Sequence, residues 1–138
     1  MDKKDIFELA TANPVFHLAT VEGDKPHVRG MLMYSADENG IVFHTGKTKD
    51  LRMQLDANPH VEMCFYSPEK NMQIRISGTV ELDENIALKN NIVADRPFLK
   101  PWVEKDSYDM LSVYRLKEGR ATIWTMETNF ASKDYIRI

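Results

Sequence analysis

The chain has 138 residues, of which 43% are hydrophobic and 28% are charged, and its formal net charge is −3. This length fits a single domain over residues 1–138, and this composition argues against intrinsic disorder. The negative charge argues against a nucleic-acid-binding protein, and the sequence has no run of about 18 apolar residues that could span a membrane.

Cys64 is the single cysteine of the sequence, so the chain cannot form an internal disulfide. This cysteine usage is typical of proteins in a reducing compartment. Residues 1–10 carry charges but lack the apolar core of a secretory signal. We therefore expect a cytoplasmic protein in which Cys64 is a buried, inert thiol rather than a nucleophile.

Short strands separated by turns dominate the pattern along the chain. Helices are predicted over residues 5–12, from Thr48 or Lys49 to Asn58, and over residues 83–94, and residues 96–102 form a connector rich in proline. Strands are predicted over residues 15–21, 27–34, 41–44, 61–66, 72–82, 110–116 and 120–126. Because most of the turns have hairpin length, we expect antiparallel pairing and a mainly β fold, a β-barrel with peripheral helices.

The strand over residues 72–82 has the clearest alternation in the sequence. Its apolar side chains, among them Ile74, Ile76 and Val80, are separated by polar residues. Gly78 interrupts this strand, which predicts a bulge or a close approach of another backbone.

The stretch over residues 43–59, FHTGKTKDLRMQLDANP, is predicted to contain a strand end, a tight turn and a short helix. Residues 45–49 supply two hydroxyls, two ammonium groups and a glycine before the helix N-terminus, where the helix dipole also favours an anion. Such a turn can bind a phosphate group, although lysines in a loop between a strand and a helix are more often simply solvated. The Walker and dinucleotide-binding glycine patterns are both absent from the sequence.

No constellation for metal binding or nucleophilic catalysis is visible in the sequence. The histidines His17, His27, His44 and His60 form no metal-binding motif, and the G-x-S-x-G pattern of serine hydrolases is absent. If the protein catalyses a reaction, we expect a bound cofactor to supply the chemistry.

An ordered set of short motifs resembles the pyridoxamine 5′-phosphate oxidase-like family of FMN-binding split β-barrels. The motifs are HVRGMLMY (27–34), FHT (43–45), Thr48-Lys49, ANPHVEM (57–63), QIRISG (73–78) and the hairpin that contains Trp124. Together they cover nearly the whole chain, and the order and spacing of the set carry the resemblance.

The resemblance implies a six-stranded antiparallel Greek-key split barrel and a homodimer with FMN at the subunit interface. The implied cofactor-binding residues are Arg29, Gly30, Met31, Leu32, His44, Thr45, Thr48, Lys49, Gln73 and Trp124. In this comparison, strand residues 29–33 lie along the flavin, and Arg29 holds the phosphate or ribityl end. Thr45, Thr48 and Lys49 hold the phosphate, Gln73 forms a hydrogen bond with the cofactor, and Trp124 lies near the ring.

The chain departs from the family's pyridoxamine-phosphate oxidases after Trp124, because no arginine follows until Arg137. This difference argues against true pyridoxamine-phosphate oxidase activity. We expect an FMN-dependent oxidoreductase that transfers electrons from a reduced nicotinamide to a small acceptor such as a nitroaromatic, a quinone or oxygen. His44 is the single, weak candidate for a proton donor. The alternatives are a flavin or small-ligand carrier, sensor or stress protein without turnover, and a heme or deazaflavin binder.

Overall fold

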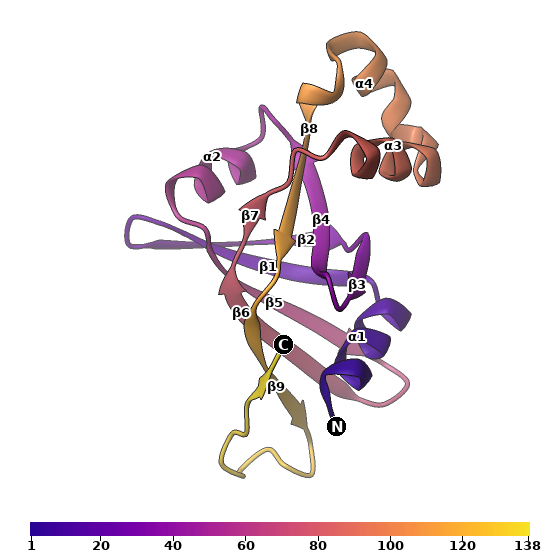
Figure 1. Ribbon diagram of the computed structural model, residues 1–138. Coiled ribbons are helices and arrows are strands. Elements are labelled where there is room, and N and C mark those ends of the chain that lie inside the picture. The colour runs from indigo at the N-terminus through magenta and orange to yellow at the C-terminus, as the bar shows by residue number, and fades with distance from the viewer.

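Two antiparallel sheets form the body of the molecule in the computed structural model (Figure 1). The larger sheet has six strands in the order β10-β9-β6-β5-β1-β2, and the smaller has four in the order β3-β4-β8-β7. The structure describes the backbone of residues 1–138 and the side chains of residues 1–104 and 107–138.

The elements have the following bounds. The larger sheet contains β1 (Val15–Glu22), β2 (Lys25–Leu32), β5 (His60–Ser67), β6 (Met72–Thr79), β9 (Gly119–Thr125) and β10 (Ile136–Arg137). The smaller sheet contains β3 (Ser35–Asp37), β4 (Gly40–Gly46), β7 (Glu81–Leu82) and β8 (Leu111–Leu116). The helices are α1 (Lys3–Ala12), α2 (Asp50–Ala57), α3 (Ile86–Asp95) and α4 (Lys100–Asp106), with short 3-10 turns at Pro97–Leu99 and Tyr108–Met110.

The prediction of a mainly β, antiparallel fold is confirmed, with local differences. The strand predicted over residues 72–82 is divided into β6 and β7, which belong to different sheets. The short strands β3 and β10 were not predicted, and the connector over residues 96–102 is partly helical, because it enters α4. These short elements lack the periodic pattern from which longer elements are recognised.

Gly78 lies at a close approach between two backbones, as the sequence predicts. It pairs with Gly119 of β9, and a Cβ atom at Gly78 would lie 2.7 Å from the carbonyl oxygen of Glu118. A Cβ atom at Gly119 would lie 2.6 Å from the carbonyl oxygen of Ser77. Both distances are too short for a side chain, so this crossing requires two glycines.

Aromatic side chains form the centre of the main core. The rings of Phe16 and Phe65 stack with centroids 4.9 Å apart, and Phe43 meets the Phe16 ring edge-on at 6.0 Å. All three residues are fully or almost fully buried. They come from β1, β5 and β4, so these rings join the two sheets.

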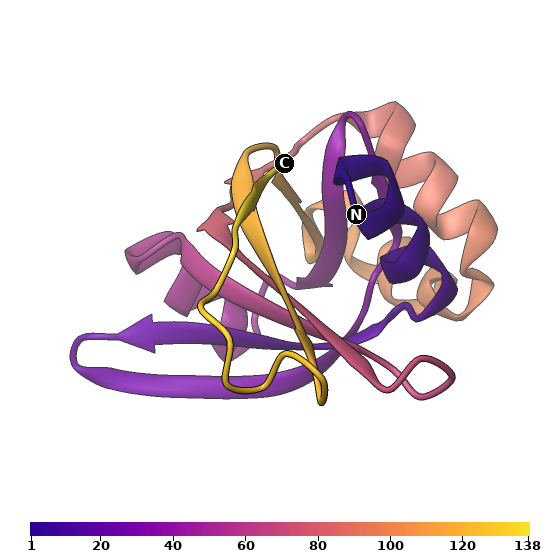
Figure 2. The same cartoon turned by 90° about the horizontal axis from the view of Figure 1, so that it is seen from below.

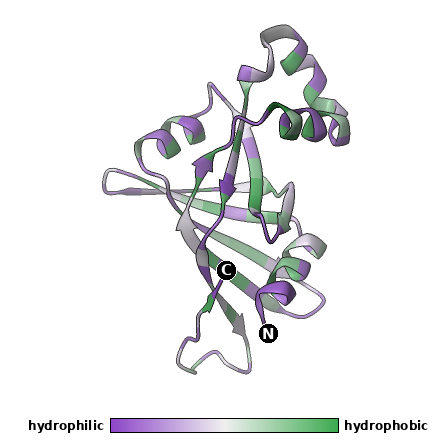
Figure 3. Ribbon diagram, viewed as in Figure 1, coloured by the Kyte–Doolittle hydropathy of each residue, from purple (hydrophilic) through white to green (hydrophobic). Residues whose placement is uncertain are grey.

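Strand β4 is buried on both of its faces. Ile41 and Phe43 point into the main core, whereas Val42 points into a second apolar cluster that contains Ile92 and Val93 of α3. Figure 3 shows the resulting continuous hydrophobic stretch along β4. Figures 1 and 2 show α2 and the α3–α4 pair on opposite sides of the molecule, so β4 runs between them.

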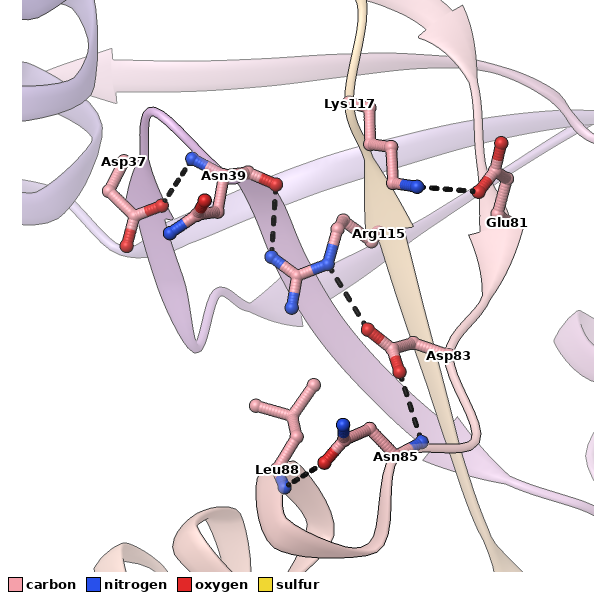
Figure 4. Close-up of polar contacts among 8 residues, drawn as sticks. All are labelled: Asp37, Asn39, Glu81, Asp83, Asn85, Leu88, Arg115 and Lys117. Carbon is pink, nitrogen blue, oxygen red and sulfur yellow. Dashed lines mark hydrogen bonds and ion pairs between the residues drawn. The ribbon is translucent and has the colours of Figure 1, made fainter.

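A polar network fixes the start of α3 against the smaller sheet (Figure 4). Arg115 donates from Nε to Asp83 at 3.2 Å and from Nη1 to the carbonyl oxygen of Asn39 at 3.0 Å. Asp83 accepts from the backbone N–H of Asn85, whose side chain caps α3 by accepting from the N–H of Leu88 at 2.9 Å. This capping determines where α3 begins, and therefore where its C-terminal residues lie.

Within the described part of the chain, none of the helices has both the length and the apolar character needed to span a membrane.

Candidate functional site

The turn between β4 and α2 has the form predicted from the sequence. Helix α2 begins at Asp50 with Lys49 as its N-cap, and it ends before Asn58-Pro59. Thr45 is buried at the end of β4, whereas Thr48 and Lys49 are exposed in the turn. The ion pairs formed among the described side chains do not include Lys49. The turn therefore presents a free cation at a helix N-terminus.

Arg29 extends from β2 toward α2 and is held by neutral oxygens. Its Nη1 donates to the carbonyl oxygen of Leu18 at 3.2 Å and to Oγ1 of Thr20 at 2.9 Å, and its Nη2 donates to Oε1 of Gln54 at 2.5 Å. Among the described side chains, no carboxylate forms an ion pair with it. Because a guanidinium has five N–H donors, two of them remain available.

The charge on Arg29 is only partly compensated by its surroundings. Burial lowers the pKa of the Arg29 guanidinium, and the carboxylate of Asp50 acts in the opposite direction. Asp50 lies one helical turn before Gln54, so it faces the same side of α2. A half-buried arginine with this environment is a suitable partner for an anion.

A second arginine holds the other side of α2. Arg52 donates from Nη1 to Oγ of Ser112 at 2.9 Å and forms an ion pair with Asp56 at 3.0 Å. Ser112 lies directly opposite Thr45 in the β4–β8 register. The helix is thus joined to β1 and β2 through Gln54 and to β8 through Arg52, which fixes the position of its N-terminus.

Arg96, the C-cap residue of α3, joins the end of β2 to β4. It donates to the carbonyl oxygens of Leu32 at 3.4 Å and Met33 at 2.8 Å, and its Nη1 lies 2.6 Å from Nε2 of His44. The guanidinium also lies over the ring of Tyr34, at 5.3 Å from the ring centroid. Two of the predicted residues, Leu32 and His44, are therefore brought together by a residue that the sequence did not indicate.

The contact with Arg96 selects the tautomer of the neutral His44 ring. An arginine can only donate, so Nε2 of His44 must accept and Nδ1 must carry the proton. Burial, reinforced by the charge of Arg96, lowers the pKa of His44 from 6.5 to about 4. At neutral pH His44 is therefore an uncharged hydrogen-bond donor through Nδ1 rather than a source of an imidazolium proton.

Replacing Arg96 with glutamine is expected to raise the pKa of His44 from about 4 toward 6.5, though not fully, because burial remains the larger cause. The folded-state pKa lies below the ordinary value, so the contribution of His44 to stability is fully present above pH 6.5 and is lost as the pH falls through about 4. A titration of the imidazole resonances by NMR measures the pKa of His44 in the wild type and in Arg96→Gln, and Arg137→Gln is the control. An unchanged pKa would show that Arg96 does not act on His44.

The remaining predicted residues lie on both faces of the larger sheet. Arg29 and Met31 point to the inner side, because Met31 pairs with the core residue Phe16. Gly30 and Leu32 alternate with them and lie on the outer face. Gln73 and Trp124 are direct cross-strand partners on β6 and β9, which are two and three strands beyond β1.

Cys64 lies on this outer face, half-buried, beside Gln73. Its Sγ is 4.0 Å from Oε1 of Gln73, and burial raises the pKa of the thiol. A raised pKa disfavours the reactive thiolate, which is consistent with the predicted inert role. The indole N–H of Trp124 donates to Asn129 at 2.8 Å.

A broad groove of about 1450 Å³ is lined in part by Thr20, the residue whose hydroxyl accepts from Arg29. Lys3, His60, Thr79, Arg120 and Arg137 are among the residues that line it, and none of the predicted cofactor-binding residues does. The predicted residues instead lie on β2, on β4 and in the β4–α2 turn, apart from Gln73 and Trp124 on β6 and β9.

The positioning residues Thr20, Gln54, Ser112 and Arg96 were missed by the sequence analysis. Gln54 left a detectable signal, since it is a polar residue on the same helix face as Leu51 and Leu55. Thr20 follows Phe16 and Leu18 at every second residue of β1, so the alternation of the strand already places its side chain on the inner face. Arg96 and Ser112 left no signal of this kind.

Comparison with known proteins gives a family and a fold. The sequence profile of the pyridoxamine 5′-phosphate oxidase family matches residues 3–96. A pyridoxine/pyridoxamine 5′-phosphate oxidase of Pseudomonas putida (strain W619) is 43% identical over 65 residues, which cover 46% of this chain and 30% of that protein. The chain thus matches less than a third of the length of this relative.

Two solved structures share the fold over nearly the whole chain. A NimC/NimA family protein from Clostridium acetobutylicum has a TM-score of 0.80 and 26% identity, covering 99% of this chain and 93% of that one. A pyridoxamine 5′-phosphate oxidase-related, FMN-binding protein from Nostoc punctiforme has a TM-score of 0.69 and 16% identity, covering 98% and 95%. The split-barrel prediction is thereby confirmed, and the profile match over residues 3–96 shows that this chain belongs to the pyridoxamine 5′-phosphate oxidase family.

Proposed function

We propose that this protein is an FMN-binding oxidoreductase that transfers electrons from a reduced nicotinamide to a small acceptor such as a nitroaromatic or a quinone. The observation that carries the proposal is Arg29, a half-buried cation without a carboxylate ion pair among the described side chains, which lies against α2. Family membership and the Nostoc punctiforme FMN-binding protein support the choice of FMN.

The donors present fit a flavin phosphate. Arg29 keeps two free N–H groups, and the turn before α2 offers the hydroxyl of Thr48 and the ammonium group of Lys49. Charged donors of this kind form strong hydrogen bonds with phosphate oxygens. The carboxylate of Asp50 lies on the Gln54 side of α2, so it faces Arg29 and cancels part of this positive charge.

When bound, FMN supplies the hydride and electron transfer. The residues of the chain would bind and orient it: Arg29 and Lys49 would hold the phosphate, and the backbone of Gly30–Leu32 would contact the ring. Arg96 keeps the end of β2 and His44 in one arrangement through its bonds to Met33 and His44. His44 offers a hydrogen bond from Nδ1 and does not supply an ionised proton at neutral pH.

We also propose that two copies of the chain share the cofactor site. Strand β2 is at the edge of the larger sheet, and its outward side chains Val28 and Leu32 are 68% and 44% exposed. Exposed apolar residues on an edge strand favour pairing with another surface.

The proposed electron acceptor and cellular location rest on the sequence. The stretch after Trp124 lacks the arginines of pyridoxamine-phosphate oxidases, so a different acceptor is proposed. The single cysteine Cys64 supports a cytoplasmic location. A flavin carrier or sensor is the second candidate, because Nε2 of His44, the candidate proton donor, is occupied by Arg96.

An absorbance spectrum of the purified protein tests this function first. After FMN addition and desalting, we expect retained flavin bands, bleaching by NADH or NADPH, and repeated reoxidation by a nitroaromatic or quinone. Lys49→Ala is expected to raise the Kd for FMN by about 10- to 100-fold, because a hydrogen bond to a charged group contributes about 1.5–3 kcal/mol. Lys133→Ala, at an exposed residue in the C-terminal segment, is the matched control.

Each outcome of this experiment has a distinct meaning. Retained flavin without multiple turnovers would support the carrier or sensor. A protein that retains no flavin before or after addition would contradict both candidates. Sedimentation of the loaded protein as a monomer would contradict the shared site.

A further inference from the structure

The Arg29 guanidinium is held by a neutral frame that belongs to two other elements. Oε1 of Gln54, on α2, accepts both from Arg29 at 2.5 Å and from the Thr20 hydroxyl at 2.6 Å. The Thr20 hydroxyl in turn accepts from Nη1 of Arg29 at 2.9 Å. Thr20 and Gln54 are both buried, so solvent cannot replace either of them without cost.

The acceptors that hold Arg29 are all uncharged. A fully buried arginine is usually paired with a carboxylate, which cancels its charge and satisfies its donors, whereas Arg29 is half-buried and its direct partners carry no charge. Here the three acceptors are an amide oxygen, a hydroxyl and a backbone carbonyl of Leu18. Such a frame fixes the direction of the guanidinium while leaving its positive charge largely intact.

We propose that Gln54 and Thr20 are positioning residues that orient Arg29 toward the phosphate of the cofactor, and that an amide instead of a carboxylate at residue 54 keeps its charge available for that phosphate. This inference rests on the proposed FMN binding and deepens it, because it assigns phosphate selectivity to residues that do not themselves contact the cofactor. Gln54 is isosteric with glutamate, so the proposal can be tested with almost no change in shape.

The test compares FMN with riboflavin, which has the same ring and ribityl chain but no phosphate. Gln54→Glu is expected to raise the Kd for FMN by about 10-fold or more, because the new carboxylate pairs with Arg29 and competes with the phosphate. The Kd for riboflavin is expected to change by less than about 3-fold, since riboflavin carries no charge for Arg29 to bind. Quenching of flavin fluorescence measures both constants.

Two further variants separate positioning from folding. Thr20→Val keeps the side-chain shape and removes the hydroxyl, and it is expected to weaken FMN binding more than riboflavin binding. Met53→Glu adds the same charge to α2 at a neighbouring residue that is 59% exposed, and it should leave both affinities nearly unchanged. Melting temperatures of the flavin-free variants identify any loss of the fold. If Gln54→Glu does not fold, the FMN and riboflavin affinities of Thr20→Val decide the proposal.

The outcomes distinguish a failure of the positioning role from a failure of FMN binding itself. A selective loss of FMN affinity in Gln54→Glu and Thr20→Val supports the proposal. Equal losses for FMN and riboflavin, or unchanged FMN affinity, overturn it while the FMN-binding function stands. If the wild-type protein binds neither flavin, the proposed function is wrong and this inference falls with it.

Discussion

Replacing Arg29 with alanine is expected to raise the Kd for FMN by about 10- to 100-fold, since each hydrogen bond to a charged partner contributes about 1.5–3 kcal/mol. Arg29 is held in one orientation by Thr20 and Gln54, so it loses little side-chain entropy when it binds an anion. We therefore expect this loss to be at least as large as that caused by removing the exposed Lys49. Isothermal titration with FMN measures the affinity.

The salt dependence of binding provides a second measurement for the same variant. If Arg29 binds the phosphate, added salt should weaken FMN binding to the wild-type protein more steeply than to Arg29→Ala. The Thr20–Gln54 hydrogen bond at 2.6 Å remains possible without Arg29, so the variant should still fold. Arg137→Ala, which removes a cation of β10, is the control. Equal affinities for FMN in wild type and Arg29→Ala would exclude Arg29 from the site.

Replacing Phe16 with alanine is expected to lower the free energy of unfolding by about 3–5 kcal/mol, as is typical for a phenylalanine truncated in a core. Phe16 is fully buried, stacks on Phe65 at 4.9 Å and meets Phe43 edge-on at 6.0 Å. Its removal leaves a cavity where the two sheets join. Urea denaturation at a fixed protein concentration, without added flavin, measures the change.

Phe130→Ala is the matched control for this core substitution. The Phe130 side chain is 98% exposed, so the same truncation should change the free energy of unfolding by less than about 0.5 kcal/mol. Similar losses in both variants would show that Phe16 does not occupy the central position that the structure gives it.

The sequence by itself determined the local elements of this protein and the broad class of its fold. Alternation predicted a strand over residues 72–82, of which residues 72–79 form β6, because every second side chain of a strand faces the core. The segment between Lys49 and Pro59 specified α2, because a residue before proline avoids the helical region. Gly78 predicted a close approach, which the structure shows against Gly119. Each of these predictions depends on residues that are near one another in the chain.

The tertiary structure alone decided which side chains meet at the candidate site. Arg29 and Gln54 are separated by 25 positions, and Arg96 and His44 by 52, so no local pattern could pair them. The first contact depends on the register of β1 with β2 and on where α2 lies against them. The second depends on where α3 ends beside β4. The neutral state of His44 follows from that contact and from burial, and neither is encoded by the residues next to His44 in the sequence.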